Sequence, residues 1–279
     1  MTQTRKTNAA RCLLIAASLL LGTPTVHASD NECSARMAEI IGRAYPGAQS
    51  VDRGLKIGGA TLALPDADAI GNDPHAPVCR VWPTHPDLTL VAVPLITHTS
   101  SDMNEGDLEL LVLDSANLNV RQRLRLPGRM ADDAVRILSV TFDTARYQVA
   151  AGRTAFGLRL GKAGSSRPNP FDETDLWLYT IDGNQIKPVL DGIVVADNSG
   201  EWDTQCAGSF SRVRRTLAID SAAHNGFADI LVTEQTTSSR STIGKSGQCT
   251  DKEDKPRRTT HRLIFNGTRY DVPKALRPL

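Results

Sequence analysis

The sequence lacks the features that mark several large classes of protein. Basic and acidic residues are nearly balanced, 32 against 31, giving a formal net charge of +1. A chain without a basic excess is a poor nucleic-acid binder, so we expect no nucleic-acid partner. Beyond residue 28 no apolar run is long enough to cross a bilayer, which predicts no membrane span. The chain also has no C-x-x-C spacing for a metal and no Gly-x-Ser-x-Gly nucleophile elbow.

Residues 1–28 have the pattern of a secretory signal peptide. Arg5, Lys6 and Arg11 precede an apolar run over residues 12–21, and Val26 and Ala28 supply small residues for cleavage near Ala28. Cleavage removes three basic and no acidic residues, which leaves 29 against 31 and a net charge of −2. The pattern predicts a periplasmic or secreted protein.

Four cysteines follow the predicted cleavage site, and an even number in an exported chain favours two disulfides. Of the three possible pairings we favour Cys33–Cys79, which ties the N-terminal segment to the rest, and Cys206–Cys249, which clamps the C-terminal part. Each closes a loop of about 45 residues, worth on the order of 4 kcal/mol from loop entropy.

Residues 175–190 predict a β-hairpin. Trp177, Tyr179 and the residues between them alternate across a strand whose two faces are both apolar, so we expect this strand to be covered on both sides. Asp182-Gly183 provides the tight turn. Pro188 cannot donate a hydrogen bond, which favours an edge position for the return strand.

Similar patterns recur along the chain and suggest an internal repeat. Residues 107–110 resemble 175–178, and 265–267 resemble 181–183, which gives units near 80–128, 134–195 and 213–275. We therefore predict an all-β, antiparallel fold with a propeller-like arrangement of about three repeated units, and a β-sandwich as the alternative. An N-terminal segment, 29–77, would carry one helix over 34–44 and a hairpin. The β domain, 78–279, would carry long polar loops at 161–175 and 236–260.

Glu201, Trp202 and Asp203 form the main candidate site. If the backbone is extended, the two carboxylates share a face, as paired acid–base catalysis requires. Trp202 could stack on a sugar or anchor a partner. The structural alternative is that Trp202 packs on the neighbouring disulfide and the acids are solvated.

Residues 225–232, NGFADILV, resemble the end of an FG-GAP repeat, the calcium-loop unit of integrin-type β-propellers. The resemblance covers about twelve residues and implies Asn225 and Asp229 as candidate metal positions, with calcium as the cofactor. The two earlier ligand positions hold Ala223 and Ser221, so the loop departs from the family's pattern. The structural alternative is an ordinary turn with no metal, and no other cofactor is expected.

Basic residues cluster at Arg257 and Arg258, which could bind an anionic partner or form a solvated run. Together these features favour an exported, non-catalytic binding protein of the cell envelope, such as an inhibitor or protective factor, with a protein or glycan partner. A hydrolase of glycans or peptidoglycan that uses Glu201 or Asp203 is the alternative, and a structural envelope module is another. The sequence leaves open whether the protein is an enzyme.

Overall fold

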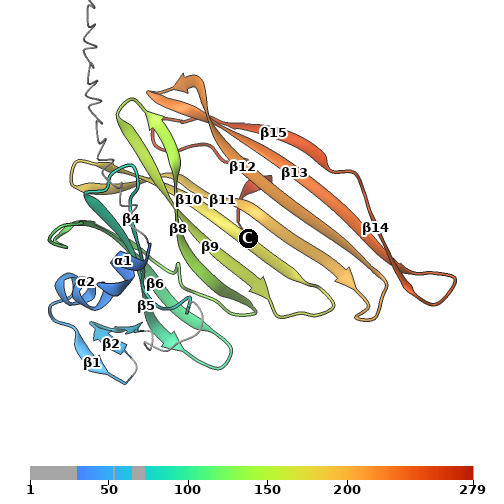
Figure 1. Cartoon of the computed structure of the whole chain (residues 1–279), viewed down its shortest axis with the longest axis horizontal. Coiled ribbons are helices and arrows are strands. Elements are labelled where there is room, and N and C mark those ends of the chain that lie inside the picture. The colour runs from blue at the N-terminus through green and yellow to red at the C-terminus, as the bar shows by residue number, and fades with distance from the viewer. Residues whose placement is uncertain (1–29, 53, 65–72, 279) are drawn as a thin grey trace, which may run out of the picture.

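The computed structural model describes residues 30–52, 54–64 and 73–278, so the predicted signal peptide and residues 65–72 lie outside the described part. Antiparallel strands dominate this part and form two sheets (Figure 1). The prediction of an all-β fold is confirmed.

Sheet A is formed by the N-terminal half of the chain and has seven strands. Its main path runs β1–β2–β3–β5–β6–β7, and β4 pairs with β5 beside β3. The strands are β1 (Gln49–Val51), β2 (Gly54–Ile57), β3 (Ala60–Ala63), β4 (Val78–Val81), β5 (Leu88–Thr99), β6 (Asn104–Asp114) and β7 (Val120–Leu126).

Sheet B is formed by the C-terminal half and has eight strands in a meander from β8 to β13, with β14 and β15 both paired to the outer side of β13. The strands are β8 (Val135–Ala150), β9 (Arg153–Gly164), β10 (Phe171–Asp182), β11 (Gln185–Trp202), β12 (Gly208–His224), β13 (Phe227–Ile243), β14 (Cys249–Glu253) and β15 (Arg257–Leu263).

The predicted N-terminal helix is present but starts earlier and is interrupted. It consists of α1 (Asp30–Ala35) and α2 (Met37–Ala44), separated at Arg36. Ile40, Ile41 and Ala44 recur at helical spacing and are buried on the outer face of sheet A, where they meet Val91 and Leu111 among others. A 3₁₀ turn, Lys274–Leu276, lies near the C-terminus.

The two sheets pack face to face around the main core. Sheet A contributes Leu90 and Leu110, and sheet B contributes Phe156, Trp177 and Tyr179. Alternate residues of β10 point to the opposite face, where Leu176 and Leu178 join a second core. The prediction that this strand is covered on both sides is therefore confirmed, and the reason is the two-residue period of a strand.

The second core lies inside the curl of sheet B. Long strands twist strongly, and the twist brings β8 close to β12 and β13. The chain's last segment then returns into this curl and buries Tyr270, Val272 and Leu276 against the sheet. In Figure 1 the C-terminus overlaps the strands of sheet B.

The prolines within the strands occupy places that have only one partner strand. Pro188 lies in the half of β11 that pairs with β10 alone, because β12 pairs only with residues 196–202 of β11. Pro94 pairs with β6 on one side and falls between the stretches of β5 that pair with β4 and β3. A residue without an N–H is tolerated at such a local edge.

The structure corrects three expectations about arrangement. Propeller blades would be separate sheets, but the predicted units 134–195 and 213–275 lie in one continuous sheet, because β11 and β12 are hydrogen-bonded. The arrangement is therefore sandwich-like, as in our alternative.

The predicted loop at 161–175 is only 165–170, since β9 and β10 extend into it, and the predicted loop at 236–260 is mostly strand. Both disulfides form as predicted, Cys33–Cys79 and Cys206–Cys249.

Candidate functional site

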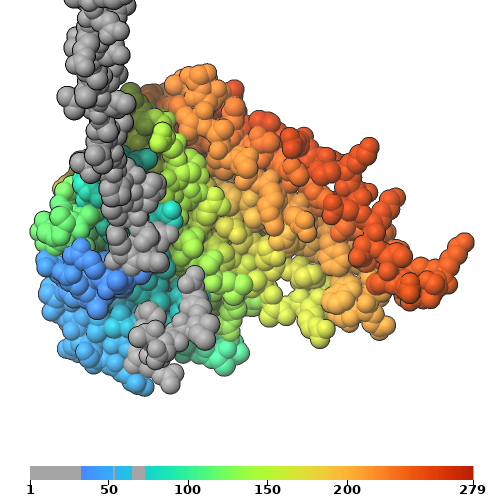
Figure 2. Space-filling model, viewed as in Figure 1, coloured from blue at the N-terminus to red at the C-terminus, as the bar shows by residue number. Residues whose placement is uncertain are grey.

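The far ends of four strands of sheet B project beyond the sandwich and form an arm. We define the arm as residues 196–202 of β11, 208–214 of β12, 235–243 of β13 and all of β14, with their connecting turns. Figure 1 shows this part extending away from sheet A, and Figure 2 shows it as a narrow projection of the surface. Among the arm's residues only Cys206 is buried.

Backbone pairing and one disulfide hold the arm together, since it has no apolar core. Cys206, in the β11–β12 turn, is bonded to Cys249 at the start of β14. The Trp202 N–H donates to the Pro168 carbonyl at 2.7 Å, which attaches the 165–170 loop to the end of β11. At the root of the arm the Arg215 guanidinium pairs with Glu234 at 2.7 Å and donates to the Val194 carbonyl.

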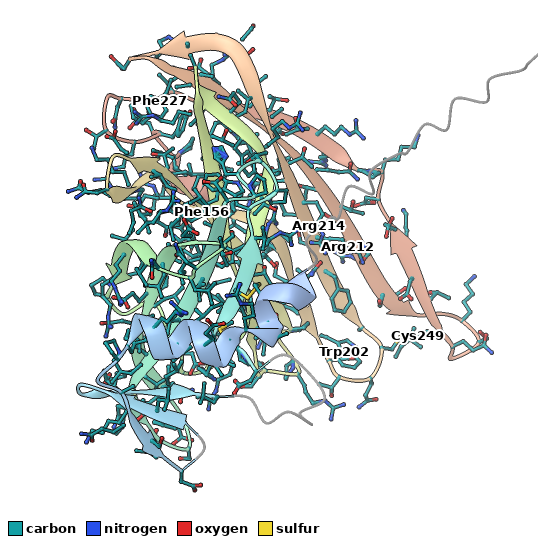
Figure 3. All side chains as sticks on the ribbon, turned by 60° about the vertical axis from the view of Figure 1, so that its left-hand side comes forward. Phe156, Trp202, Arg212, Arg214, Phe227 and Cys249 are labelled. Atoms are coloured by element: carbon teal, nitrogen blue, oxygen red, sulfur yellow. A yellow bond between two sulfur atoms is a disulfide. The ribbon has the colours of Figure 1, made fainter. Side chains whose placement is uncertain are left out.

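Glycine is required at two places on one face of the arm. The ring of Phe210 lies over Gly200 and Gly208, and a Cβ added at Gly200 would come within 2.5 Å of the ring. On this face Arg212 and Arg214 follow Phe210 at alternate positions along β12. Figure 3 shows Arg212, Arg214 and Trp202 on the projecting strands, well apart from Phe156 in the body.

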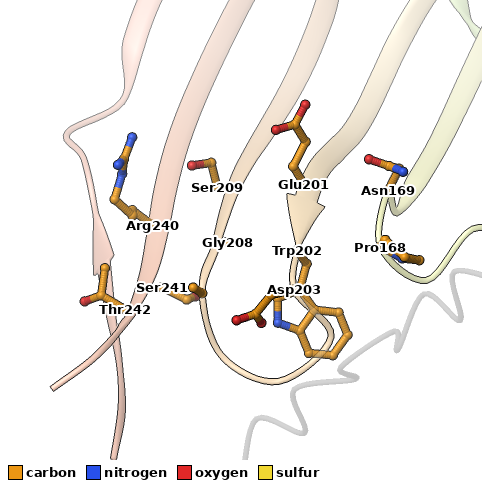
Figure 4. Close-up of a pocket in the computed structure, with 11 residues that line it drawn as sticks. Pro168, Asn169, Glu201, Trp202, Asp203, Gly208, Ser209, Arg240, Ser241 and Thr242 are labelled. Atoms are coloured by element: carbon orange, nitrogen blue, oxygen red, sulfur yellow. The ribbon is translucent and has the colours of Figure 1, made fainter.

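The opposite face of the arm carries two rows of aligned polar residues. Ser199, Ser211 and Ser238 are directly opposite one another on three neighbouring strands. The next row consists of Glu201, Ser209, Arg240 and Lys252 on four strands. These seven residues line a hollow of about 710 Å³, which we call the trough. A second hollow, of about 460 Å³, continues from it to Trp202 at the end of the arm (Figure 4).

Of the residues predicted from sequence as the main site, Glu201 lines both hollows, and Trp202 and Asp203 line the smaller one. The Asp203 carboxylate accepts the backbone N–H groups of Gln205 and Cys206, at 2.9 and 2.7 Å. These hydrogen bonds hold the pKa of Asp203 below its usual value. The carboxylate therefore stabilises the turn that carries the disulfide. Glu201 is exposed, and Figure 4 shows its side chain pointing in a different direction from that of Asp203.

Arg257 and Arg258, the predicted anion-binding residues, lie at the start of β15 on the outer edge of sheet B. Arg258 contacts the Gln235 amide oxygen at 3.4 Å. Residues 249–260 are exposed throughout and rich in charge, and Pro256 lies among them. Charged residues and proline on an edge strand discourage pairing with another chain.

Asn225 and Asp229 do not form an oxygen cluster suited to calcium. Asn225 and Gly226 make the hairpin turn with φ of 50° and 82°, and the Asn225 amide donates to the Phe265 carbonyl. The buried Asp229 carboxylate accepts hydrogen bonds from His224 at 2.7 Å and Arg262 at 2.9 Å. Burial alone would raise the pKa of Asp229, but these two partners outweigh it and lower the pKa. Among the described residues no group of three or more metal-binding side chains occurs.

Arg240, Lys252 and Ser238 were not predicted as site residues because 236–260 was predicted to be a loop, and the other trough serines lie in segments for which no strand was predicted. The available signal was alternation, as in Ser199-x-Glu201, Ser209-x-Ser211 and Ser238-x-Arg240, with polar residues at every second place. No helix in the described part of the chain is long and apolar enough to cross a membrane.

No family model, curated protein or solved structure matches this chain. Two disulfides are typical of an oxidising compartment outside the cytoplasm.

Proposed function

We propose that this protein is an exported, non-catalytic binding protein of the cell envelope and that it recognises its partner through the arm. The observation that carries the proposal is a four-stranded extension with two exposed faces, held by a disulfide and lacking a core. Such an extension buries little apolar surface and contributes little to folding. Its value to the protein lies in the surface that it presents.

The arrangement of the carboxylates supports recognition over hydrolysis. A glycosidase needs two carboxyl groups that face the same bond, one of which gives or takes a proton. Here the Asp203 carboxylate is occupied by two backbone N–H groups. Both bonds fall on Oδ1 and lower the pKa of Asp203, so the group stays ionised and is a poor proton donor. For a protein partner, an inhibitor or a protective factor is the expected role.

The proposal is tested by immobilising the mature chain, residues 29–279, and passing envelope extract over it. The arm variant Trp202→Ser/Arg240→Ser is compared with a body variant, Arg121→Ser/Lys187→Ser, which removes two exposed charged side chains elsewhere. We expect the arm variant to retain at least about tenfold less of the wild-type ligand, as for loss of interface anchors, and the body variant to match wild type.

Equal retention by the wild type, the arm variant and the body variant would show that the binding surface lies outside the arm, which would contradict the proposal. A second measurement addresses hydrolysis directly. Glu201→Gln and Asp203→Asn are incubated with peptidoglycan beside the wild type, and release of soluble fragments is followed. Turnover by the wild type that either substitution abolishes would establish the hydrolase instead.

A further inference from the structure

The trough contains charges that have no partner within the protein. Arg240 and Lys252 are directly opposite each other on β13 and β14. Like charges in that position repel each other. Neither side chain makes an ion pair or hydrogen bond with any described residue, and neither does Glu201. Glu201 is two strands away from Arg240, about 10 Å at the usual strand spacing, with Ser209 between them.

An anion between Arg240 and Lys252 would relieve this repulsion. A carboxylate or phosphate group accepts charge-assisted hydrogen bonds from a guanidinium and an ammonium group at once. The arm supplies both from neighbouring strands on the same face. The cationic pair therefore selects for a ligand with a negative charge.

Hydroxyl groups dominate the rest of the trough floor. Ser199, Ser209, Ser211 and Ser238 line the hollow, and each hydroxyl can donate one hydrogen bond and accept two. Two carboxylates, which are acceptors, also line the hollow: Glu201 at the end of the second row and Asp254 just after β14. Donors and acceptors mixed at short intervals match a ligand that itself carries many hydroxyls. A row of small side chains also leaves the space that such a ligand needs.

Trp202 borders the smaller hollow beside Pro168, but its side chain leaves β11 on the face of Gly200 and Phe210, opposite to Glu201 and the serines. The two hollows share Asn169, Glu201, Ser209 and Arg240 and so form one continuous surface. Their volumes fall within the usual range of about 300–1,000 Å³ for ligand sites.

We propose that the trough binds an acidic glycan, a chain of sugar residues that carries carboxylates. A carboxylate lies between Arg240 and Lys252, and the sugar hydroxyls bond to the serines and Glu201. This inference rests on the proposed function, because it names the ligand class of the same arm. A strand-shaped peptide would instead be expected at a sheet edge, and the edge of sheet B is charged and interrupted by Pro256.

The test uses three probes of similar length and isothermal titration calorimetry on the mature chain. The probes are an oligoalginate, which is a chain of uronic acids, a neutral glucan oligomer, and oligoglutamate, which has carboxylates but no hydroxyls. We expect binding of oligoalginate, with both other probes at least about tenfold weaker, because a charge or a hydroxyl network missing at a polar site costs on the order of 1.4 kcal/mol or more.

Three variants then separate the two kinds of contact. Arg240→Ala/Lys252→Ala should weaken oligoalginate binding by about tenfold or more and remove most of its salt dependence. Ser209→Val/Ser211→Val should weaken it by about fivefold while keeping the salt dependence, since only hydroxyls are lost. Arg212→Ala, an exposed arginine on the opposite face, is the matched control and should bind within about twofold of wild type.

Equal binding of oligoglutamate and oligoalginate would show that the trough recognises negative charge alone, which would overturn the inference. Absence of oligoalginate binding would overturn it as well. In either case arm-dependent retention of another ligand from envelope extract would leave the proposed function intact. If arm-dependent retention were lost as well, both the acidic-glycan inference and the proposed function would be contradicted. Circular dichroism of each variant confirms that the fold is kept.

Discussion

The body and the arm of this molecule are built from the same meander but are stabilised in different ways. In the body, β10 is covered by apolar residues on both faces, and Leu178 is fully buried. In the arm, the continuation of the same sheet has two exposed faces, and backbone pairing with one disulfide replaces the core. The difference separates folding from recognition, because substitutions in the body should change stability and those in the arm should change binding.

The largest expected effect is at a buried ion pair in the body. Lys162 contacts Asp175 at 2.6 Å, and Glu173 lies 3.8 Å from the same ammonium group. Asp175 is fully buried on the face of β10 that meets sheet A. Lys162→Met leaves the buried Asp175 carboxylate without its cation and should destabilise the protein by about 3–5 kcal/mol in urea unfolding. Arg240→Met on the arm should change stability by less than about 0.5 kcal/mol.

A second substitution shows whether charge is the cause. Lys162→Met/Asp175→Leu replaces the pair with apolar side chains and should recover a large part of the loss, since a neutral pair carries no desolvation cost. Equal unfolding free energies for the single and double variants would contradict this explanation and leave packing as the reason.

The two disulfides offer a more direct comparison, because their loops are nearly equal, with separations of 46 and 43 residues. Loop entropy alone predicts about 4 kcal/mol for each. We expect Cys33→Ala/Cys79→Ala to lower global stability by a value near that, since Cys33 and Cys79 are buried in a core of the body. Cys206→Ala/Cys249→Ala should lower it by less than half as much and instead increase amide hydrogen exchange in the arm. Equal losses of global stability would show that the arm unfolds together with the body.

The same contrast explains which parts of the structure could be predicted from sequence. The strand around Trp177 has apolar residues at every second position, and the helix around Ile40 has them at helical spacing. These apolar residues are the ones that pack into the two cores. The disulfide pairs were also predictable, because each of these cysteines bonds to the cysteine next to it in the sequence. In the arm that signal is absent. Ser238, Arg240 and Thr242 alternate with other polar residues, so a real strand has the composition of a loop.

The arrangement in space was less predictable than the elements. Similar strand–turn–strand segments suggested separate blades, but hydrogen bonding between β11 and β12 depends on residues 196–202, which have no apolar pattern. The trough was hidden for the same reason. Glu201 was identified in the sequence, yet its neighbours Ser209 and Arg240 come from strands that local patterns did not reveal.

A smaller effect is expected at Asp143, a residue of the body whose ionisation makes the stability of the protein depend on pH. Its carboxylate accepts hydrogen bonds from Arg159 at 2.6 Å and from Tyr147 at 2.9 Å. Burial alone would raise the pKa of Asp143, but a backbone N–H and Arg159 outweigh it and lower the pKa below its ordinary 3.8. A lowered pKa stabilises the fold above the unfolded-state pKa, and this contribution is lost as the pH falls through the folded-state pKa.

Asp143→Asn should therefore reduce stability at pH 7 by about 1–2 kcal/mol and make the loss below pH 4 less steep. Urea unfolding at a series of pH values measures both effects. Asp203→Asn on the arm is the comparison, since the pKa of Asp203 is also lowered, by backbone N–H groups. Its effect should be confined to hydrogen exchange near the β11–β12 turn. A pH profile of Asp143→Asn parallel to that of wild type would contradict the assignment.

The smallest effect on stability, and a distinct effect on association, is expected at the outer edge of sheet B. Lys255, Arg257 and Arg258 are exposed there, beside Pro256. Lys255→Thr/Arg257→Thr/Arg258→Thr should change the unfolding free energy by no more than about 0.5 kcal/mol, because solvated side chains are replaced by a good strand former. The same variant should self-associate, since charge no longer blocks pairing along the edge. Sedimentation velocity distinguishes the outcomes: a variant that sediments as wild type does and loses binding of a partner from envelope extract would show that Arg257 and Arg258 belong to the recognition surface rather than protecting the edge.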